Sequence, residues 1–73
     1  MQKITGETVI NSVAEKRKVR NLTQEELAEK AGVTRQTIIA IEKGNYIPSV
    51  LLAIKISKVF KLPLEEIFKY EKI

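Results

Sequence analysis

Apolar residues recur at helical spacing along most of this chain, and the pattern is clearest between Leu22 and Gly44. Leu27 and Ala31 fall on one face of a first segment. Ile38 falls on one face of a second segment, together with an isoleucine one turn later. A period of about 3.6 residues is typical of amphipathic helices, so the pattern predicts two short helices joined by a tight turn.

Start and stop signals fit these two helices. The Thr23 hydroxyl can accept a backbone N–H, and Glu26 can bond back to the Thr23 amide, which completes a capping box. Gly32 tolerates the left-handed conformation that ends a helix. Thr34 can cap the second helix, which we expect to run to Lys43.

Helix, turn and helix over residues 23–43 predict a helix-turn-helix motif. In such a motif the second helix can enter the major groove of DNA. An ordinary helical hairpin would carry the same caps and the same glycine. Spacing alone therefore leaves DNA binding and a merely connecting turn as alternatives.

Three further helices are predicted around the motif. They cover Thr8–Arg20, Val50–Phe60 and Leu64–Tyr70. The buried arc of the first of them comprises Val9, Ile10, Val13, Ala14 and Arg17. Together with the motif these make five helices around one core, so we expect a compact all-α domain that spans residues 1–73, with room for short strands at its ends.

The C-terminal third carries more apolar side chains than one small core can bury. The helix at 50–60 is apolar nearly all round, and the tail Phe68–Ile73 alternates apolar and charged residues as a strand does. The tail could pair with Gln2–Thr5, or with its copy in a second subunit. A symmetric dimer would bury the surplus, and its expected interface residues are Leu51, Leu52, Ile54, Val59, Phe68, Tyr70 and Ile73. The alternative is that the tail frays and Leu51 is a single exposed leucine.

Composition narrows the classes of protein. A chain of 73 residues suffices for one small domain, and its net charge of +4 suits a polyanionic partner, although other basic domains share it. The chain has no cysteine and no histidine, so we expect neither a zinc site nor another cofactor. It shows no apolar run of the length that a signal peptide or a membrane span needs. We expect a soluble, cytoplasmic protein with no small-molecule substrate.

Arg17 stands in the centre of an apolar arc, where arginine is rare unless it is paired. Glu42, near the end of the motif, is its expected partner in a structural ion pair. The alternative is that the Arg17 side chain extends its guanidinium to water. The basic run from Lys16 to Arg20 is either a solvated face or a surface near DNA phosphates.

Four short motifs occur in order, at Leu22–Ala28, Gly32–Ile38, Ile41–Gly44 and Pro48–Ser49. Their order and gaps resemble the lambda-repressor-like helix-turn-helix family, the phage Cro and repressor type that includes small Xre regulators. The resemblance extends over about residues 9–68, most of the chain.

The resemblance implies a set of DNA-binding positions. Base-reading residues would be Arg35, Gln36, Thr37 and Ala40, and contacts to the DNA backbone would come from Thr23, Gln24, Thr34, Lys43 and Asn45. Arginine can pair bidentately with guanine and glutamine with adenine, and the N-terminus of a helix suits a phosphate. Each of these residues could instead be an ordinary polar surface residue.

Three positions depart from the family pattern. Lys16 and Ser57 replace residues that are usually apolar or small and apolar, and Lys61 stands where glycine often ends the fourth helix. Ser57 could bond back to its own helix. None of the three lies on the expected reading surface, so they bear on helix packing rather than on DNA binding.

These features predict a sequence-specific regulator that binds double-stranded DNA in the major groove, as a repressor and as a homodimer on a palindrome. The alternative is an antitoxin of the same fold, whose apolar helix and tail bind a toxin or another protein. An enzyme is disfavoured, because the chain has no histidine, cysteine or aspartate and no glycine-rich phosphate loop.

Overall fold

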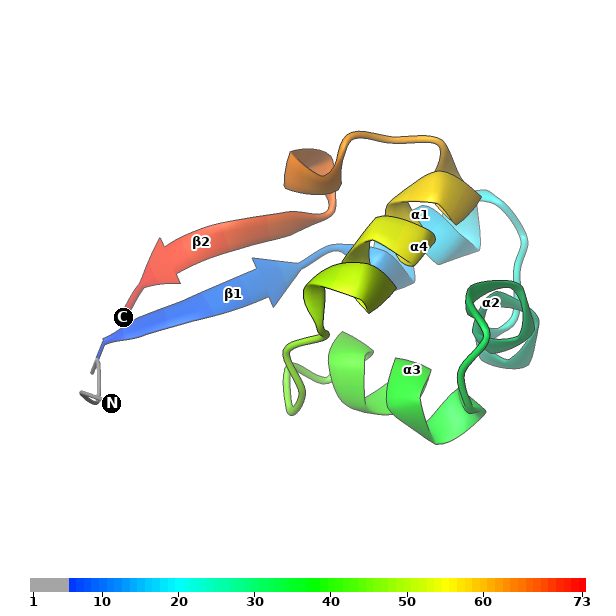
Figure 1. The fold of residues 1–73 in the computed structure, drawn as a ribbon, viewed down its shortest axis with the longest axis horizontal. Coiled ribbons are helices and arrows are strands. Elements are labelled where there is room, and N and C mark those ends of the chain that lie inside the picture. Colours follow the sequence, from blue (N-terminus) through cyan, green and yellow to red (C-terminus); the bar gives the residue numbers. More distant parts are fainter. Residues whose placement is uncertain (1–5) are drawn as a thin grey trace.

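The helices of the central motif begin where their caps predict. The computed structural model describes residues 6–73, in which α2 (Gln24–Ala31) and α3 (Arg35–Glu42) flank a short turn (Figure 1). The Thr23 Oγ1 atom accepts the N–H of Glu26 at 3.0 Å, and the Glu26 carboxylate accepts the N–H of Thr23 at 2.8 Å. The predicted capping box is therefore complete.

The turn between α2 and α3 follows its sequence signals too. Gly32 has φ 74° and ψ 32°, the left-handed conformation in which a side chain would be strained. The Thr34 hydroxyl accepts the N–H of Thr37 at 3.3 Å and so caps α3. Val33, between the two caps, packs against the core.

Two more helices, α1 (Val13–Val19) and α4 (Val50–Phe60), complete the helical body (Figure 1). The core is built from the apolar faces of these helices and from the segment that follows α4. Its buried residues are Val13, Leu27, Ala28, Ala31, Ile38, Ile41, Leu52, Ala53, Ile56, Phe60, Ile67 and Phe68. None of the helices in the described part of the chain is long and apolar enough to cross a membrane.

The predicted helix Thr8–Arg20 is wrong in its first half. Residues Glu7–Asn11 form the strand β1, and the helix begins only at Val13. β-Branched residues are enriched in strands, and the run Thr8–Ile10 contains three in succession. The Asn11 side chain accepts the N–H of Val13 at 3.0 Å and thereby fixes the point where strand gives way to helix.

The predicted helix Leu64–Tyr70 is also wrong. Only Leu64–Glu66 is helical, as a single 3₁₀ turn η1, and the strand β2 (Phe68–Lys72) follows. The strand expected from the alternating tail is present, and it pairs antiparallel with β1 of the same chain, with Val9 opposite Tyr70. The suggested partner segment Gln2–Thr5 lies outside the described residues.

The fold class differs accordingly from the expected all-α domain of five helices. Residues 6–73 form four α-helices, one 3₁₀ turn and a two-stranded antiparallel sheet. The sheet extends to one side of the helical body, and both described chain ends lie at its far tip (Figure 1). The hydrogen bond from Ser12 N to Ile67 O, at 2.9 Å, joins its base to the body.

Two of the side chains expected at the dimer interface are buried in the core of their own chain. Phe68 and Leu52 belong to the core of the same chain, because each is only 7% exposed. Val59 is half-buried, whereas Leu51, Ile54 and Tyr70 are exposed.

Two of the departures from the family pattern have a clear structural outcome. The Ser57 hydroxyl donates to the carbonyl of Ile54 at 2.7 Å, within its own helix, as the sequence suggested. Lys61 takes the left-handed conformation, with φ 59°, in the place of the usual glycine.

Candidate nucleic-acid interface

The first turn of α3 carries side chains expected to read DNA bases. Arg35 and Gln36 are exposed there, whereas Thr37 is half-buried, as is Ala40 one turn further along the helix. The hydroxyl groups of Thr34 and Thr37 lie 3.1 Å apart, so Thr37 is held beside the cap. This face of α3 therefore presents two long polar side chains that can reach base edges and two short ones that permit close approach.

The N-terminus of α2 lies beside that of α3. The Thr23 hydroxyl serves the capping box, and Gln24 Nε2 donates to Glu42 Oε1 at 3.0 Å, so both side chains are already engaged within the protein. A shallow hollow between the two helix starts is lined by Arg17, Thr23, Gln24, Glu25 and Arg35. The first N–H groups of α2 have no carbonyl one turn earlier and are suited to a phosphate.

Arg17 and Glu42 meet across the body of the protein. Arg17 Nε lies 2.7 Å from Glu42 Oε2, and Nη2 lies 3.2 Å from Oε1, which makes the pair bidentate. The side chains are only 12% and 8% exposed, and Arg17 Nη1 also donates to the carbonyl of Leu22 at 2.9 Å. Because Gln24 donates to the same carboxylate, one cluster joins α1, the start of α2 and the end of α3.

The charge of Glu42 is maintained by this cluster. Burial alone would raise the pKa of the Glu42 carboxyl, but hydrogen bonds from Arg17 and Gln24, with the positive charges of Arg17 and Lys18, hold it below its ordinary value of 4.5. The carboxylate therefore stays ionised at neutral pH and holds the last turn of α3.

Lys43 and Asn45 lie at the opposite end of α3 from the reading turn. Both are exposed, Lys43 at the C-cap of the helix and Asn45 in the loop that follows. The N–H of Asn45 donates to the carbonyl of Ala40 at 2.9 Å, which leaves its side chain outside the helix. An eight-residue helix is about 12 Å long, so most of the length of α3 separates these two residues from Gln36.

Two polar residues hold the scaffold and were missed by the sequence reasoning. Asn11 donates from Nδ2 to the carbonyl of Ile41 at 2.9 Å, and so ties the end of β1 to the last turn of α3. Arg20 donates to the carbonyl of Phe60 at 2.8 Å and lies over its ring, 5.0 Å from the centroid. A signal for Asn11 existed, since asparagine side chains often accept the backbone N–H two residues on, but the helix predicted over Thr8–Arg20 included this residue.

Within residues 6–73, no three Glu, Asp, His or Cys side chains come close enough together to hold a metal ion. The charged groups of Arg17 and Glu42 are buried and bond to each other, so this pair has a structural role. What remains exposed on α3 is suited to hydrogen bonding with base edges and with phosphates.

A capped two-helix motif, with its second helix held at the last turn and exposed at the first, defines a helix-turn-helix DNA-binding protein. The chain belongs to the lambda-repressor-like helix-turn-helix family, because the HTH_3 family model, described as helix-turn-helix, matches residues 13–67. Members of this family regulate transcription by binding DNA and are not enzymes.

Similar proteins agree with this assignment. The uncharacterized HTH-type transcriptional regulator MJ0272 of Methanocaldococcus jannaschii is 64% identical over 55 residues, which cover 75% of this chain and 83% of that protein. The uncharacterized HTH-type transcriptional regulator YgzD of Bacillus subtilis is 52% identical over 62 residues, which cover 85% of this chain and 94% of that protein.

Solved structures show the same fold. The restriction-modification controller protein C.AhdI from Aeromonas hydrophila matches with a TM-score of 0.70 and 26% identity, over 74% of this chain and 82% of that one. The transcriptional regulator VanUg matches with a TM-score of 0.77 and 18% identity, over 100% of this chain and 97% of that one.

Proposed function

We propose that this DNA-binding regulator is a repressor that binds a palindromic operator as a homodimer. The observation that carries the proposal is that α3 is exposed at its first turn and held by side-chain contacts at its last turn. Its first turn exposes Arg35 and Gln36, while its last turn is held by the Glu42 carboxylate and by Asn11. A helix held at one end and polar at the other can enter a major groove without losing its orientation. A DNA target also supports the cytoplasmic location expected from the sequence.

The two kinds of DNA contact fall to different residues in this proposal. Sequence would be read by Arg35, Gln36, Thr37 and Ala40, and the DNA backbone would be held by Thr23, Gln24, Thr34, Lys43 and Asn45. The side chains of Thr23 and Gln24 are engaged within the protein, and the Thr23 N–H donates to Glu26, so the backbone N–H of Gln24 is the simplest phosphate donor here.

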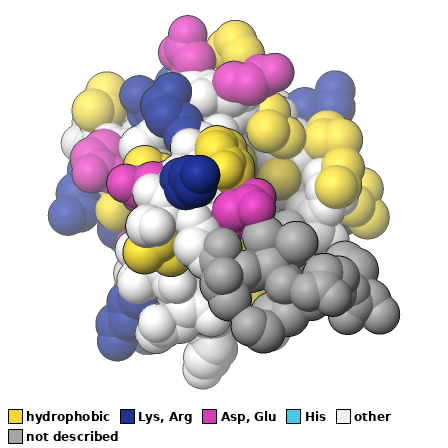
Figure 2. Space-filling view, turned by 90° about the vertical axis from the view of Figure 1, so that its left-hand side faces the viewer, with side chains coloured by type: hydrophobic (Ala, Val, Ile, Leu, Met, Phe, Trp, Pro, Cys, Tyr) yellow, Lys and Arg dark blue, Asp and Glu magenta, His cyan; other side chains and the backbone are white. Residues whose placement is uncertain are grey.

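The dimer is supported by an apolar surface next to the recognition helix. Val50, Leu51 and Ile54 at the start of α4 are 75%, 64% and 40% exposed, and Ile47 in the preceding loop is 52% exposed. Figure 2 shows hydrophobic side chains gathered along the right-hand edge of the face that it views. Such a patch next to α3 could be buried by a second copy, which would place two recognition helices in successive major grooves, about 34–36 Å apart.

The proposed base contacts are tested in two steps. Duplexes that the wild type binds are first selected from a random pool, and the affinity of Gln36→Ala for the selected site and for random DNA is then measured. We expect this variant to lose about 1–3 kcal/mol on the selected site, with much less change on random DNA, because a base contact is lost. Glu66→Ala, in the exposed η1 turn, serves as the control and should bind like the wild type. Equal losses on both kinds of DNA would remove Gln36 from the reading surface.

The dimer is tested by sedimentation with Ile54→Glu, which places charges in the proposed interface. The wild type should sediment at about twice the 8.3 kDa chain mass, and the variant at the mass of one chain. Tyr70→Glu, on the exposed face of β2, shows whether the sheet takes part. A wild-type protein that stays monomeric at the highest measurable concentration would refute the homodimer.

A further inference from the structure

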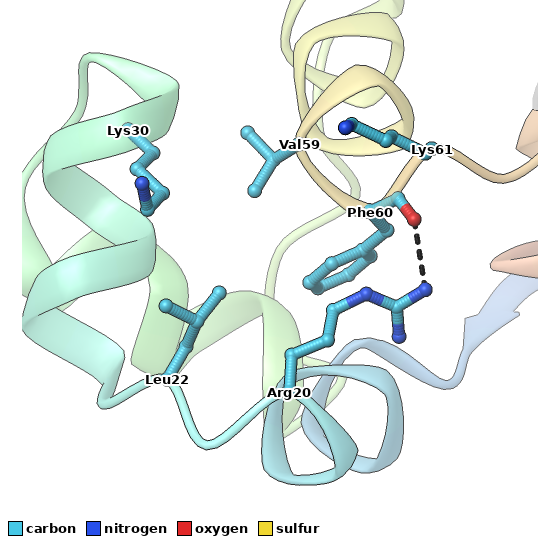
Figure 3. A pocket seen from close by; sticks show the side chains of 6 residues that line it. All are labelled: Arg20, Leu22, Lys30, Val59, Phe60 and Lys61. Carbon is cyan, nitrogen blue, oxygen red and sulfur yellow. Dashed lines mark hydrogen bonds between the residues drawn. The ribbon is translucent and has the colours of Figure 1, made fainter.

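A second surface, away from α3, combines an apolar floor with positive charge. It lies between α2 and α4 and is lined by Arg20, Leu22, Lys30, Val59, Phe60 and Lys61 (Figure 3). An adjoining depression shares Lys30 and Val59 and adds the basic residues Lys55 and Lys58. We call these two joined depressions the basic groove.

Most of the positive charge that lines this groove is not paired with a carboxylate of the same chain in the described residues. In the described part of the chain, the ion pair within 4.0 Å is that of Arg17 with Glu42, and the four lysines of the groove have no carboxylate partner. Glu29 is the one acidic residue in its lining. Like charges gathered without partners repel one another, so an anion bound among them would be favoured.

The helix-turn-helix itself does not hold the excess of positive charge. Residues 23–45 contain four glutamates against three basic residues, whereas the whole chain has a net charge of +4. The surplus is therefore outside the part that reads DNA. The groove has a large share of it, and no residue of α3 lines either depression.

Arg20 is fixed in position before any ligand arrives. Its Nη2 donates to the carbonyl of Phe60 at 2.8 Å and its Nη1 to the carbonyl of Lys16 at 2.9 Å. A guanidinium has five N–H donors, so donors remain for an incoming carboxylate. Figure 3 shows Lys30 and Lys61 extending from α2 and from the end of α4, on either side of Val59 and Phe60.

We propose that the basic groove docks an acidic segment of a partner protein, in which an apolar side chain is flanked by carboxylates. The apolar side chain would cover Leu22 and Val59, and the carboxylates would pair with Arg20 and the lysines. Phosphates of DNA would satisfy the charges but leave this apolar floor uncovered. Because α3 takes no part, the partner and the DNA can be bound at the same time.

The probe for this proposal is a fluorescein-labelled peptide of about twelve residues, in which Leu and Phe are each flanked by glutamates. Binding is followed by fluorescence anisotropy and by backbone amide shifts of the labelled protein. The shifts should fall on the groove, at residues such as Lys30 and Val59, and not on α3. No binding at up to about 1 mM peptide would overturn the proposal.

Matched variants separate the groove from general charge. The double change Lys30→Glu with Lys61→Glu should weaken peptide binding at least about tenfold. Lys69→Glu with Lys72→Glu alters the net charge equally on the exposed strand β2 and should change it less than about twofold. Equal losses in the two double variants would mean that only net charge matters, which contradicts the proposal.

Two further arms test the chemistry of the ligand. A peptide with Leu and Phe replaced by Ser should bind at least about fivefold more weakly, because the floor then stays uncovered. Random-sequence duplex DNA should change the backbone amide shifts of α3. It should leave the amide shifts of the groove unchanged and should not displace the bound peptide. Equal binding of the two peptides, or displacement of the peptide by that DNA, would refute the docking of an acidic protein segment.

Discussion

Removing one member of the Arg17–Glu42 pair should destabilise the protein far more than removing both. In Arg17→Met the Glu42 carboxylate stays in a site that is 8% exposed, with Gln24 as its remaining side-chain donor. In Glu42→Leu the guanidinium keeps only its bond to the carbonyl of Leu22. A buried charge without its partner costs about 3–5 kcal/mol, a large part of the about 5–15 kcal/mol that stabilises a small domain.

The double variant Arg17→Met with Glu42→Leu should be much milder, because it buries apolar groups of similar volume and leaves no charge behind. The measurement is urea unfolding followed by circular dichroism, at one fixed protein concentration, for the wild type and the three variants. We expect a coupling energy of about 2 kcal/mol or more from the double-mutant cycle.

Matched single changes on the surface provide the controls for this cycle. Lys58→Met and Glu29→Leu remove the same types of charge from exposed positions and should each change the unfolding free energy by less than about 0.5 kcal/mol. A coupling energy near zero would refute the reasoning, since it would mean that Arg17 and Glu42 contribute independently in spite of their 2.7 Å contact.

Three further predictions concern single positions. Because folding lowers the pKa of Glu42, ionisation of this carboxyl contributes fully to the stability of the folded protein above its ordinary pKa of 4.5, and this contribution should be lost as the pH falls below that value. The urea midpoint of Glu42→Gln should therefore fall less on acidification than that of the wild type. Lys61→Gly should raise the unfolding free energy by about 1 kcal/mol, measured as a higher melting temperature, because Lys61 has φ 59°; an unchanged or lower value would contradict this. Asn11→Asp can still accept the N–H of Val13 but cannot donate to the carbonyl of Ile41, so it should cost about 1–3 kcal/mol in the same assay, and wild-type stability would show that this bond contributes nothing.

The central motif could be predicted from the sequence because its signals are local. Thr23, Glu26, Gly32 and Thr34 each act within four residues of their own position, and each has the expected role in the structure. The Arg17 pair is a longer-range contact. This pair could nevertheless be predicted from the sequence, because an arginine in an apolar arc needs a partner and the family resemblance indicated which residue it is.

The two ends of the chain were mispredicted because their structure depends on each other. Val9 and Ile10 fit the arc of a helix as well as a strand, and only pairing with Tyr70 and Lys69, about sixty residues away, selects the strand. The same pairing ends the helical turn after Glu66 and turns Phe68 into the core. No window of sequence contains that information.

The contacts at the last turn of α3, of which sequence reasoning missed the one from Asn11, explain why one end of this helix is fixed and the other is free. Asn11 holds the carbonyl of Ile41, and Arg17 with Gln24 holds the Glu42 side chain, so three elements converge on the last turn. The first turn has only its own cap from Thr34. A recognition helix needs its axis fixed and its leading side chains unpaired, and these two demands are met at opposite ends of one eight-residue helix. In the proposed function the sheet would therefore contribute to DNA reading through α3, because β1 supplies Asn11, a residue that ties the last turn of α3 to the rest of the protein.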